Sequence, residues 1–469
     1  MYKEKIDAYI DSHREEMLKD LSMLVKIDST RGEEQEGKPY GEGPAAVLDA
    51  AAKLLESCGL KVRNYGNRVI TGDFSDQEKA LDILAHLDVV PVTEADWTVT
   101  KPFEPKIVGD RIYGRGTADD KGPAIAALYA LRAIRELGIP LKKSVRLILG
   151  SDEECGSSDL EYYYGIEEEA PFSFTPDADF PLINIEKGRY AEEFTGSFTP
   201  NGNLPRVERI KSGTKRNVVP AKAEAVLKGI SAAVLEEKAA QIAKETGTSI
   251  SFEQEGEDII HVKVTGLAAH ASTPEVGKNA LCALLELCAS LPLAESDGQK
   301  AISALAQMFP FADTCGKALG IYASEPESGE LTMCLSVLDY TPEGLRGEFD
   351  SRLPVGCSSE TVALPMDARF KEAGLTIASL EVSEPHCVPG DSWFVQTLLS
   401  SYERYFGMKG VPLSTGGGTY VHHLKRGVAF GCMTEDVDNH MHGDDEFMEI
   451  SRFTDSAKIF ADAIIKICG

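Results

Sequence analysis

The amino-acid sequence predicts an α/β protein, with a mostly parallel sheet and helices on both faces, interrupted by an inserted α+β domain. The chain of 469 residues is too long for one typical hydrophobic core. Its first third alternates buried-strand and amphipathic-helix patterns, which is typical of a parallel sheet. The middle changes to two similar runs of short strands and helices, and the first pattern then returns. We therefore expect an α/β domain at residues 1–185 and 385–469, and an inserted domain of two similar halves at 186–384.

The elements of the first third follow from hydrophobic spacing. Residues 81–85 are apolar except for Asp82, as expected of a buried strand. Residues 122–137 place apolar side chains on one helix face, and Gly138 directly after them marks the helix end. The same criteria predict helices at 1–26 and 45–58, and strands at 145–149 and 182–185.

The inserted domain and the C-terminal part follow from the same patterns. The first half of the insertion has predicted strands at 207–211, 223–227, 249–253 and 259–265, with helices at 232–245 and 279–291. The second half has strands at 331–338, 345–351 and 376–382, with a helix at 361–372. The α/β pattern then resumes with a helix at 393–406, a strand at 428–430 and a last helix from residue 452.

Composition excludes several functional classes. A formal net charge of −27 argues against a nucleic-acid partner, which requires clustered Lys and Arg. No apolar run approaches the ~18–20 residues that span a bilayer. Residues 1–26 are charged and amphipathic, without the apolar core of a signal peptide. The ten cysteines are scattered singly, which is typical of reduced thiols. We expect a cytoplasmic protein with no membrane partner.

Histidines and carboxylates occur together in short segments at strand and helix ends. His86-Leu-Asp88 follows the first predicted buried strand. Residues two apart on an extended chain point the same way, so Asp88 is expected behind His86, accepting its second ring N–H. The alternative is a structural His–Asp pair that fixes a loop.

Four further segments carry acidic residues or histidines. Gly114-Arg-Gly-Thr-Ala-Asp119-Asp120-Lys121-Gly122 opens a predicted helix, where acidic residues also act as caps. Asp152-Glu153-Glu154 follows a strand, and three adjacent acids repel one another unless a cation or shared proton offsets their charge. A solvated acidic loop is the alternative there. The remaining segments are Pro176-Asp177-Ala-Asp179 and His440-Met-His442-Gly-Asp-Asp-Glu446.

Metal binding explains these segments as a set. His86, Asp119, Glu154, Asp177 and His442 supply two imidazoles and three carboxylates, which suit Zn²⁺, Mn²⁺ or Co²⁺ better than Ca²⁺ or Mg²⁺. Five ligands exceed the needs of one tetrahedral ion and fit two divalent ions that activate a bridging water. Glu153 remains as a general base. By composition alone, His440 and His442 are equivalent candidates.

Together these segments resemble the co-catalytic metallopeptidases related to carboxypeptidase G, aminoacylase and succinyl-diaminopimelate desuccinylase. The resemblance covers essentially the whole chain, in the right order. Within that group the sequence is most similar to the peptidase V type of dipeptidase, a carnosinase-like Xaa-His or beta-Ala-Xaa dipeptidase. The further matching segments are Arg216-Asn217, residues 266–275, residues 350–354 and residues 416–420.

The resemblance implies a role for each matching residue. Asp119 bridges the two ions, His86 and Asp177 complete one site, and Glu154 and His442 complete the other. Glu153 is the base, with Asp88 beside it as a further catalytic residue. The inserted domain is a lid whose Asn217 and His270 assist the oxyanion, and Arg352 with the backbone of Gly417, Gly418 and Thr419 holds the substrate carboxylate. The resemblance also implies a cis peptide between Asp119 and Asp120.

We therefore expect a two-metal dipeptidase, with Zn²⁺ as the first choice of metal and Mn²⁺ or Co²⁺ as alternatives. The runner-up is an N-acyl-amino-acid amidohydrolase, a deacylase or desuccinylase with the same metals. A metal-free binding protein would require the loss of Glu153 or a ligand. His422 and His423 stand where relatives usually carry an arginine, which affects carboxylate recognition. The second half of the insertion can take the place of a lid that a partner subunit would otherwise supply. We therefore expect a monomer that works by lid closure. His261 is expected to be a surface or packing residue.

Overall fold

A computed structural model describes residues 2–469. The chain forms two compact units, each described by itself. The first unit comprises the residues up to Ile185, Cys387–Ser414 and Gly418–Gly469. The second unit comprises Glu186–His386 and Thr415–Gly417.

The first unit is built on a nine-stranded sheet whose centre is parallel. The pairs β6–β3, β3–β7 and β7–β24 are parallel, while β1–β2, β2–β6 and β24–β8 are antiparallel. The predicted mostly parallel α/β sheet is therefore confirmed, with antiparallel strands added on both sides. The strand order is β1 (Lys61–Tyr65), β2 (Val69–Asp73), β6 (Ser144–Gly150), β3 (Lys79–His86), β7 (Phe172–Thr175), β24 (Gly427–Ala429), β8 (Ile183–Glu186) and β22 (His386–Cys387), with β23 (Leu413–Thr415) paired to β8.

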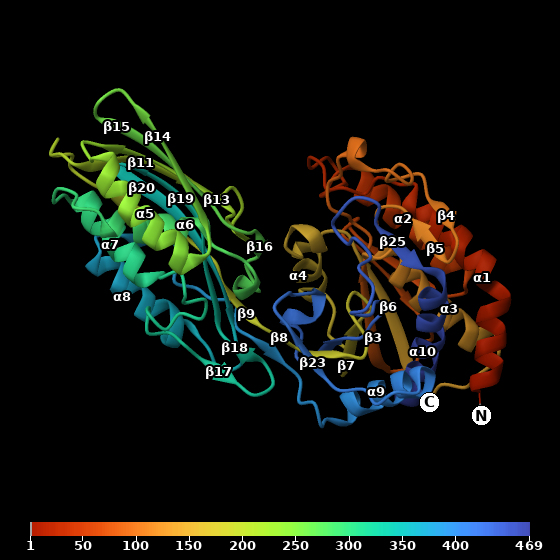
Figure 1. The fold of residues 1–469 in the computed structure, drawn as a ribbon. Coiled ribbons are helices and arrows are strands. Elements are labelled where there is room, and N and C mark those ends of the chain that lie inside the picture. The colour runs from red at the N-terminus through yellow and green to blue at the C-terminus, as the bar shows by residue number, and fades with distance from the viewer. Residues whose placement is uncertain (1) are drawn as a thin grey trace. The chain divides into compact units, whose positions relative to one another are not determined.

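Successive side chains of the central strands point to opposite faces of the sheet, and both faces are covered by other elements. Ile83 and Ala85 of β3 face a large core to which α2 (Glu42–Ser57) contributes together with α1 (Lys3–Val25), α3 (Lys121–Glu136), α9 (Trp393–Phe406) and α10 (Ile450–Cys468). Leu84 faces a smaller core under α4 (Ser158–Tyr164) and the 3₁₀ helix η5 (Tyr420–His423). Figure 1 shows α1, α3 and α10 together on one side of β3 and β6.

Smaller elements complete the first unit. Helix α2 packs beside β1 and β2. A three-stranded sheet joins β4 (Lys106–Val108), β5 (Arg111–Tyr113) and β25 (Phe447–Glu449), so that residues near the C-terminus lie beside the segment that precedes α3. The 3₁₀ helices η1 (Glu94–Asp96) and η2 (Glu153–Cys155) lie in loops.

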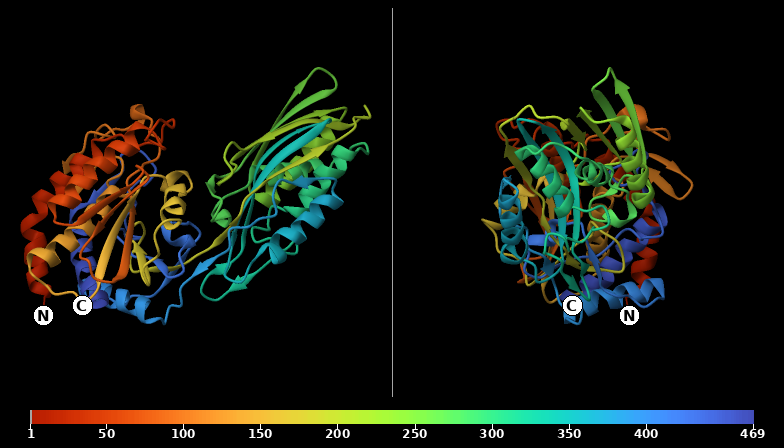
Figure 2. Two further views of the ribbon diagram at one scale, coloured as in Figure 1. Left: turned by 180° about the vertical axis from the view of Figure 1, so that it is seen from behind. Right: turned by 60° about the vertical axis from the view of Figure 1, so that its left-hand side comes forward.

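The second unit has one antiparallel sheet with all four of its α-helices on one face (Figures 1 and 2). The strand order is β14 (Ser249–Glu255), β15 (Ile259–Thr265), β13 (Lys222–Lys228), β11 (Arg206–Ser212), β19 (Thr332–Thr341), β20 (Gly344–Leu353), β10 (Glu193–Ser197) and β21 (Thr376–Ile377), with β9 (Gly188–Tyr190) paired to β20. The helices are α5 (Ala232–Thr246), α6 (Ala280–Ser290), α7 (Asp297–Met308) and α8 (Leu364–Glu372). This is the predicted α+β insertion, in which two strand sets meet where β11 pairs with β19.

Short elements of the second unit form its remaining loops. Two small ladders join β12 (Val218–Val219) to β16 (Ala269–His270), and β17 (Ser324–Glu325) to β18 (Gly329–Glu330). A 3₁₀ turn, η3 (Pro274–Val276), follows β16, and a π-helical turn, η4 (Ser359–Ala363), leads into α8. The strand predicted at 376–382 was too long, because β21 pairs with β10 through only two residues.

Two findings bear on the chain's surroundings. Within residues 2–469, no helix is both long enough and apolar enough to cross a bilayer. Among residues 2–469 no cysteine forms a disulfide, and most of the ten cysteines are buried.

Asp82, the polar residue in the apolar stretch of β3, is part of a buried ion pair. Its carboxylate accepts hydrogen bonds from Nε and Nη2 of Arg146 at 2.8 and 2.7 Å. The same carboxylate accepts from the hydroxyl of Tyr164 and the backbone N–H of Ala170. Neither charged side chain is more than 3% exposed. The pair therefore ties β3 and β6 to the loop that precedes β7.

We predict that Asp82→Ala lowers the free energy of unfolding by about 3–5 kcal/mol, because it leaves the Arg146 guanidinium buried without its partner. Urea unfolding followed by circular dichroism measures this. Lys61→Ala, which removes an exposed ion pair with Asp76, is the control and should leave stability nearly unchanged. Equal effects of the two substitutions would contradict the prediction.

Candidate metal centre

His86 stands at the end of β3 with both ring nitrogens engaged. Its Nδ1 lies 3.0 Å from the backbone oxygen of Asp88 and 3.5 Å from Oδ1 of the same residue. The predicted partner is therefore Asp88, but its carbonyl is closer than its carboxylate. These contacts orient the ring, so that Nε2 faces the carboxylates of Asp119 and Asp177 at 2.8 and 3.6 Å.

Asp119 lies between two imidazoles. One carboxylate oxygen is 2.8 Å from Nε2 of His86, and the other is 2.8 Å from Nε2 of His442. The peptide between Asp119 and Asp120 is cis, as predicted. The carboxylate of buried Asp120 turns to the other side and accepts the backbone N–H of His86 at 3.1 Å.

Glu153 and Glu154 occupy η2, directly after β6. The carboxylate of Asp88 accepts both of their backbone N–H groups, at 3.2 and 3.1 Å. Asp88 therefore contacts the His86 ring through its backbone carbonyl. Its carboxylate holds η2, the turn that carries both glutamates. Burial, together with the nearby Asp177, Asp119 and Glu154, raises the pKa of Glu153 well above its usual range, against an opposing effect of His86.

Two overlapping groups of side chains have the spacing that a metal ion requires. Donor atoms of His86, Glu153 and Asp177 lie within 4.8 Å of one another, as do those of His86, Asp119 and Glu154. His442 joins the second group, with Nε2 3.1 Å from Oε1 of Glu154. Imidazole and carboxylate donors packed at this density fit divalent transition ions.

The two candidate histidines of the C-terminal segment face different partners. Nε2 of His442 contacts Asp119 and Glu154, whereas Nδ1 of His440 lies 2.9 Å from the backbone oxygen of Asp444. His440, His442 and Asp445 all have a positive φ, between 56° and 61°. Left-handed backbone at non-glycine residues is concentrated at functional sites. His442 therefore faces the carboxylates of the centre, whereas His440 contacts the backbone of its own turn.

The residues predicted at the lid lie in the second unit. Asn217 and His270 are neighbours there, because the backbone oxygen of Asn217 accepts the N–H of Ala271 and Val218 pairs with His270. Both side chains are exposed, and Nδ1 of His270 lies 2.6 Å from Oγ of Ser272. Arg352 is buried and bonded to Asp350 and to the carbonyl of Gly416.

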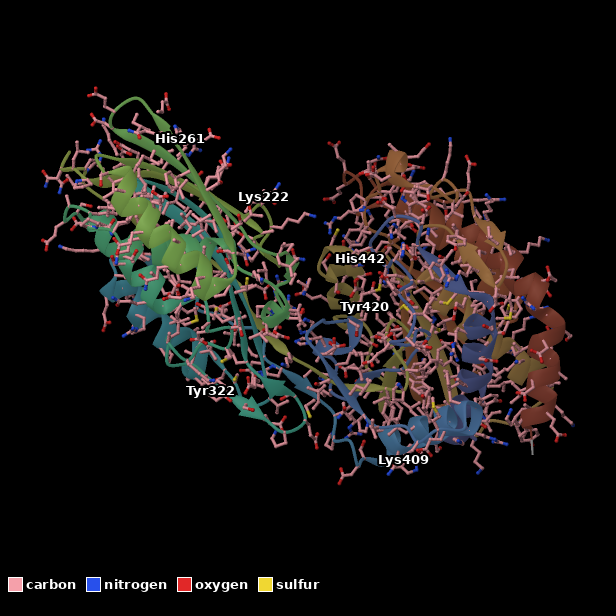
Figure 3. All side chains as sticks on the ribbon, in the orientation of Figure 1. Lys222, His261, Tyr322, Lys409, Tyr420 and His442 are labelled. Carbon is pink, nitrogen blue, oxygen red and sulfur yellow. The ribbon has the colours of Figure 1, made fainter. Side chains whose placement is uncertain are left out.

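The glycine-rich loop predicted to hold a carboxylate spans the boundary of the two units. Gly417 belongs to the second unit, and its N–H donates to Oγ1 of Thr415 at 3.1 Å. Gly418 and Thr419 belong to the first unit, where Thr419 caps η5 by accepting the N–H of Val421. In Figure 3, His442 and Tyr420 are labelled in the first unit, and His261 is labelled on β15 of the second, where it pairs with Glu255 at the surface.

A family model described as Peptidase family M20/M25/M40 matches residues 83–466, most of the chain. The chain belongs to this peptidase family. The Beta-Ala-Xaa dipeptidase of Lactobacillus delbrueckii subsp. lactis is 33% identical over 472 residues, which cover 99% of this chain and 98% of the relative. The YtjP protein of Bacillus subtilis (strain 168) is 34% identical over 465 residues, 97% of each chain.

Solved structures share the fold of this M20 peptidase. Human carnosine dipeptidase 1 has a TM-score of 0.60 at 16% identity, and the match covers 100% of this chain and 99% of that one. The aminoacylhistidine dipeptidase from Vibrio alginolyticus has a TM-score of 0.59 at 14% identity, with 97% and 96% covered. At these identities the likeness concerns the fold alone.

Sequence reasoning missed Glu446 as a structural residue of this M20 site. Its fully buried carboxylate accepts the backbone N–H groups of Gly116, Ala118 and Asp119, at 2.9–3.2 Å, and pairs with Arg115. Glu446 therefore fixes the loop that presents Asp119. It appeared in the sequence only as the end of an acidic run, which gave no sign that it is buried.

A second residue that sequence reasoning missed is Asp159, which lies under η2, the turn that carries Glu153 and Glu154. Buried Asp159 accepts the N–H groups of Ser151 and Asp152 and the hydroxyl of Tyr420, at 2.5–3.0 Å. Burial, the largest cause, raises its pKa to about 7. A Cβ at Gly150 would lie 2.0 Å from the Tyr420 hydroxyl, so only glycine fits there. The ring of Tyr420 also meets His86 edge-on, with centroids 6.2 Å apart.

We predict that His442→Ala lowers the number of divalent ions bound per chain by one, because it removes the imidazole that faces Asp119 and Glu154. Plasma mass spectrometry of dialysed, metal-reconstituted protein measures the stoichiometry. His440→Ala, two residues away, is the matched control and should bind as much metal as the unmodified protein. The reverse pattern would assign the ligand to His440.

Proposed function

We propose that this M20 peptidase is a dipeptidase, a hydrolase that cleaves the peptide bond of dipeptides with free N- and C-termini. The observation that carries the proposal is the Asp119 carboxylate, with one oxygen 2.8 Å from each of the two histidine Nε2 atoms. Such an arrangement suits two ions that share one carboxylate. The 33% identity to a Beta-Ala-Xaa dipeptidase, over nearly the whole of both chains, supports the substrate class.

Two divalent ions are the proposed cofactors, with Zn²⁺ as the first choice and Mn²⁺ or Co²⁺ as alternatives, since the donors are imidazoles and carboxylates. His86 and Asp177 would hold one ion, Glu154 and His442 the other, and Asp119 both. When bound, such ions would act as Lewis acids and lower the pKa of a bound water.

In this proposal Glu153 moves the proton. Its carboxylate takes a proton from the attacking water and returns it to the amine nitrogen that leaves. The contacts of Asp88 support this role, because the carboxylate that holds the N–H of Glu153 belongs to the residue that orients His86. The base and the His86 ring are therefore positioned by one residue, Asp88.

The second unit contributes recognition groups in the same proposal. Asn217 and His270 would stabilise the oxyanion, and their adjacency in the β12–β16 ladder supports a joint role. Arg352 and the backbone of Gly417, Gly418 and Thr419 would hold the substrate carboxylate. Together, residues 1–185 and 385–469 would form the catalytic domain, and residues 186–384 the lid.

We predict that metal-reconstituted protein hydrolyses dipeptides faster than tripeptides or N-acetyl amino acids, because the proposed site recognises both free ends of a dipeptide. Glu153→Ala should keep the bound metal and lose about two to four decades of turnover, the usual contribution of a general base. Both are measured by release of free amino acid, with metal content determined on the same samples.

Glu161→Ala is the control for Glu153, because it removes an exposed glutamate on the neighbouring helix α4. Its turnover should match that of the unmodified protein. Near-normal turnover by Glu153→Ala with full metal would show that another group is the base. Preferred hydrolysis of N-acetyl amino acids would instead favour the amidohydrolase.

We also propose that the protein works as a monomer by lid closure. The two strand sets within the one sheet of the second unit support this, since the second set can replace a partner's lid. Light scattering should give the mass of one chain. Mixing the inactive variants His270→Ala and Glu153→Ala should restore no activity, because each site would use its own lid. A stable dimer or restored activity would overturn the proposal.

A cytosolic location is proposed as well. The ten cysteines, which form no disulfide within the described residues, support it, since secreted proteins tend to pair their cysteines. Fractionation of the producing cell tests it, and recovery of the protein outside the cytosol would contradict it.

A further inference from the structure

The backbone that carries Glu153 is held by two buried carboxylates. The N–H groups of residues 151 and 152 both donate to Oδ2 of Asp159, at 2.6 and 3.0 Å. Those of residues 153 and 154 donate to the carboxylate of Asp88, at 3.2 and 3.1 Å. Both carboxylates are fully buried, and hydrogen bonds to a buried charged group are costly to break. These four successive bonds therefore fix the backbone of the proposed base.

The hydroxyl of Tyr420 donates to the same oxygen of Asp159, at 2.5 Å. Burial, followed by the charge of Asp159, raises the pKa of Tyr420 well above its usual range, so the hydroxyl stays protonated and can donate. The other oxygen of Asp159 accepts the N–H of Leu160 at 2.7 Å. The backbone donors all lie within residues 151–160, whereas Tyr420 comes from a distant segment. Its hydroxyl therefore ties that segment to the turn of the base.

The end of β6 leaves room for this contact. A Cβ at Gly150 would lie 2.0 Å from the hydroxyl oxygen of Tyr420 and 2.4 Å from Oδ2 of Asp159, closer than a real Cβ contact. Gly150 directly precedes the N–H groups that Asp159 accepts. The absence of a side chain at this position thus lets the hydroxyl and the carboxylate reach the backbone of the turn.

Tyr420 also adjoins two other parts of the proposed site. Its ring meets the ring of His86 edge-on, with centroids 6.2 Å apart and an interplanar angle of 88°. It begins η5 directly after Thr419, in the loop that is proposed to hold the substrate carboxylate. The hydroxyl of Tyr420, which is labelled in Figure 3, is bonded to Asp159. Removal of the hydroxyl alone therefore separates the link to the base from the contact with His86.

We propose that Tyr420 and Asp159 are positioning residues for Glu153, and that they fix the place of its carboxylate through the N–H groups of residues 151 and 152. This role extends the proposed hydrolase function and rests on it. Both side chains act through the backbone that precedes the base. Since a catalytic group displaced by about 1 Å can lose about a hundredfold in rate, their loss should lower kcat.

The first test is Tyr420→Phe, which keeps the ring beside His86 and removes only the hydroxyl. It should lower kcat about ten- to a hundredfold, with KM and metal content unchanged, because the base is displaced but present. In the Glu153→Ala background the same substitution should have no further effect, because the group that it positions is absent. The assays are run at pH 8, above the pKa of about 7 of Asp159, so that its carboxylate is charged.

The second test is Asp159→Asn, which keeps the size of the side chain and removes its charge. It should lower kcat at least as much as Tyr420→Phe does. Addition of Tyr420→Phe to this variant should change kcat little further, because the hydroxyl acts through this carboxylate. If the Asp159 variant does not fold, the comparison of Tyr420→Phe with and without Glu153 still decides the matter.

Tyr129→Phe is the matched control. The hydroxyl of this buried tyrosine on α3 also donates to a carboxylate, that of Asp20 on α1, at 2.7 Å. Its loss should leave kcat and KM unchanged. An unchanged kcat in Tyr420→Phe would overturn the proposal, as would an equal fall in the Glu153→Ala background, which would indicate an effect on the metal ligands or the fold. A rise in KM alone would place the effect in the loop before Tyr420 and would also overturn it.

The variants are assayed on whichever substrate the unmodified protein cleaves, a dipeptide or an N-acetyl amino acid, since both hydrolyses require a base. Cleavage of N-acetyl amino acids alone would contradict the dipeptidase proposal, yet the same comparisons would still test the role of Tyr420. Cleavage of neither substrate would overturn both proposals.

Discussion

Repulsion among buried carboxylates is the constraint on which the arrangement of the first unit depends. Asp119, the neighbours Glu153 and Glu154, and Asp177 come from three separate segments and meet near the ends of β3, β6 and β7. Burial is the largest cause that raises the pKa of Glu153, Glu154 and Asp177, and the negative charge of Asp119 raises all three further. Such a group is stable only when cations, protons or hydrogen-bond donors offset its charge. Within the chain, His86 and His442 supply part of that offset.

The acidic residues around this centre divide into two kinds. Asp88, Asp159 and Glu446 use their carboxylates to accept backbone N–H groups, so each fixes a turn. Asp119 and Glu154 instead direct carboxylate oxygens at histidine nitrogens. Residues of the first kind stabilise the loops, and residues of the second kind lie where those loops meet. In the second unit, the buried carboxylate of Asp350 likewise holds other groups in place, the guanidinium groups of Arg352 and Arg189.

The sequence predicted the α/β sheet and its insertion because both depend on local hydrophobic spacing. It also placed His86 and Glu153 correctly at strand ends, since ligands in open α/β sheets gather there. It could not identify Asp159 or Glu446 as buried, because Asp159 meets Tyr420 and Glu446 meets residues 116–119 only across long distances in the chain. It also could not place Arg189 opposite Arg352, because only the register of β9 against β20 brings the two together, and register depends on tertiary packing.

The contact of Glu446 with the loop before α3 has a consequence for biosynthesis. Residues 116–119 leave the ribosome long before Glu446, yet their backbone N–H groups are held by its carboxylate. His442, which meets Asp119, is made almost as late. A nascent chain therefore carries an acidic loop without its partners until translation is nearly finished. Assembly of the centre is thus a late event in the synthesis of the chain.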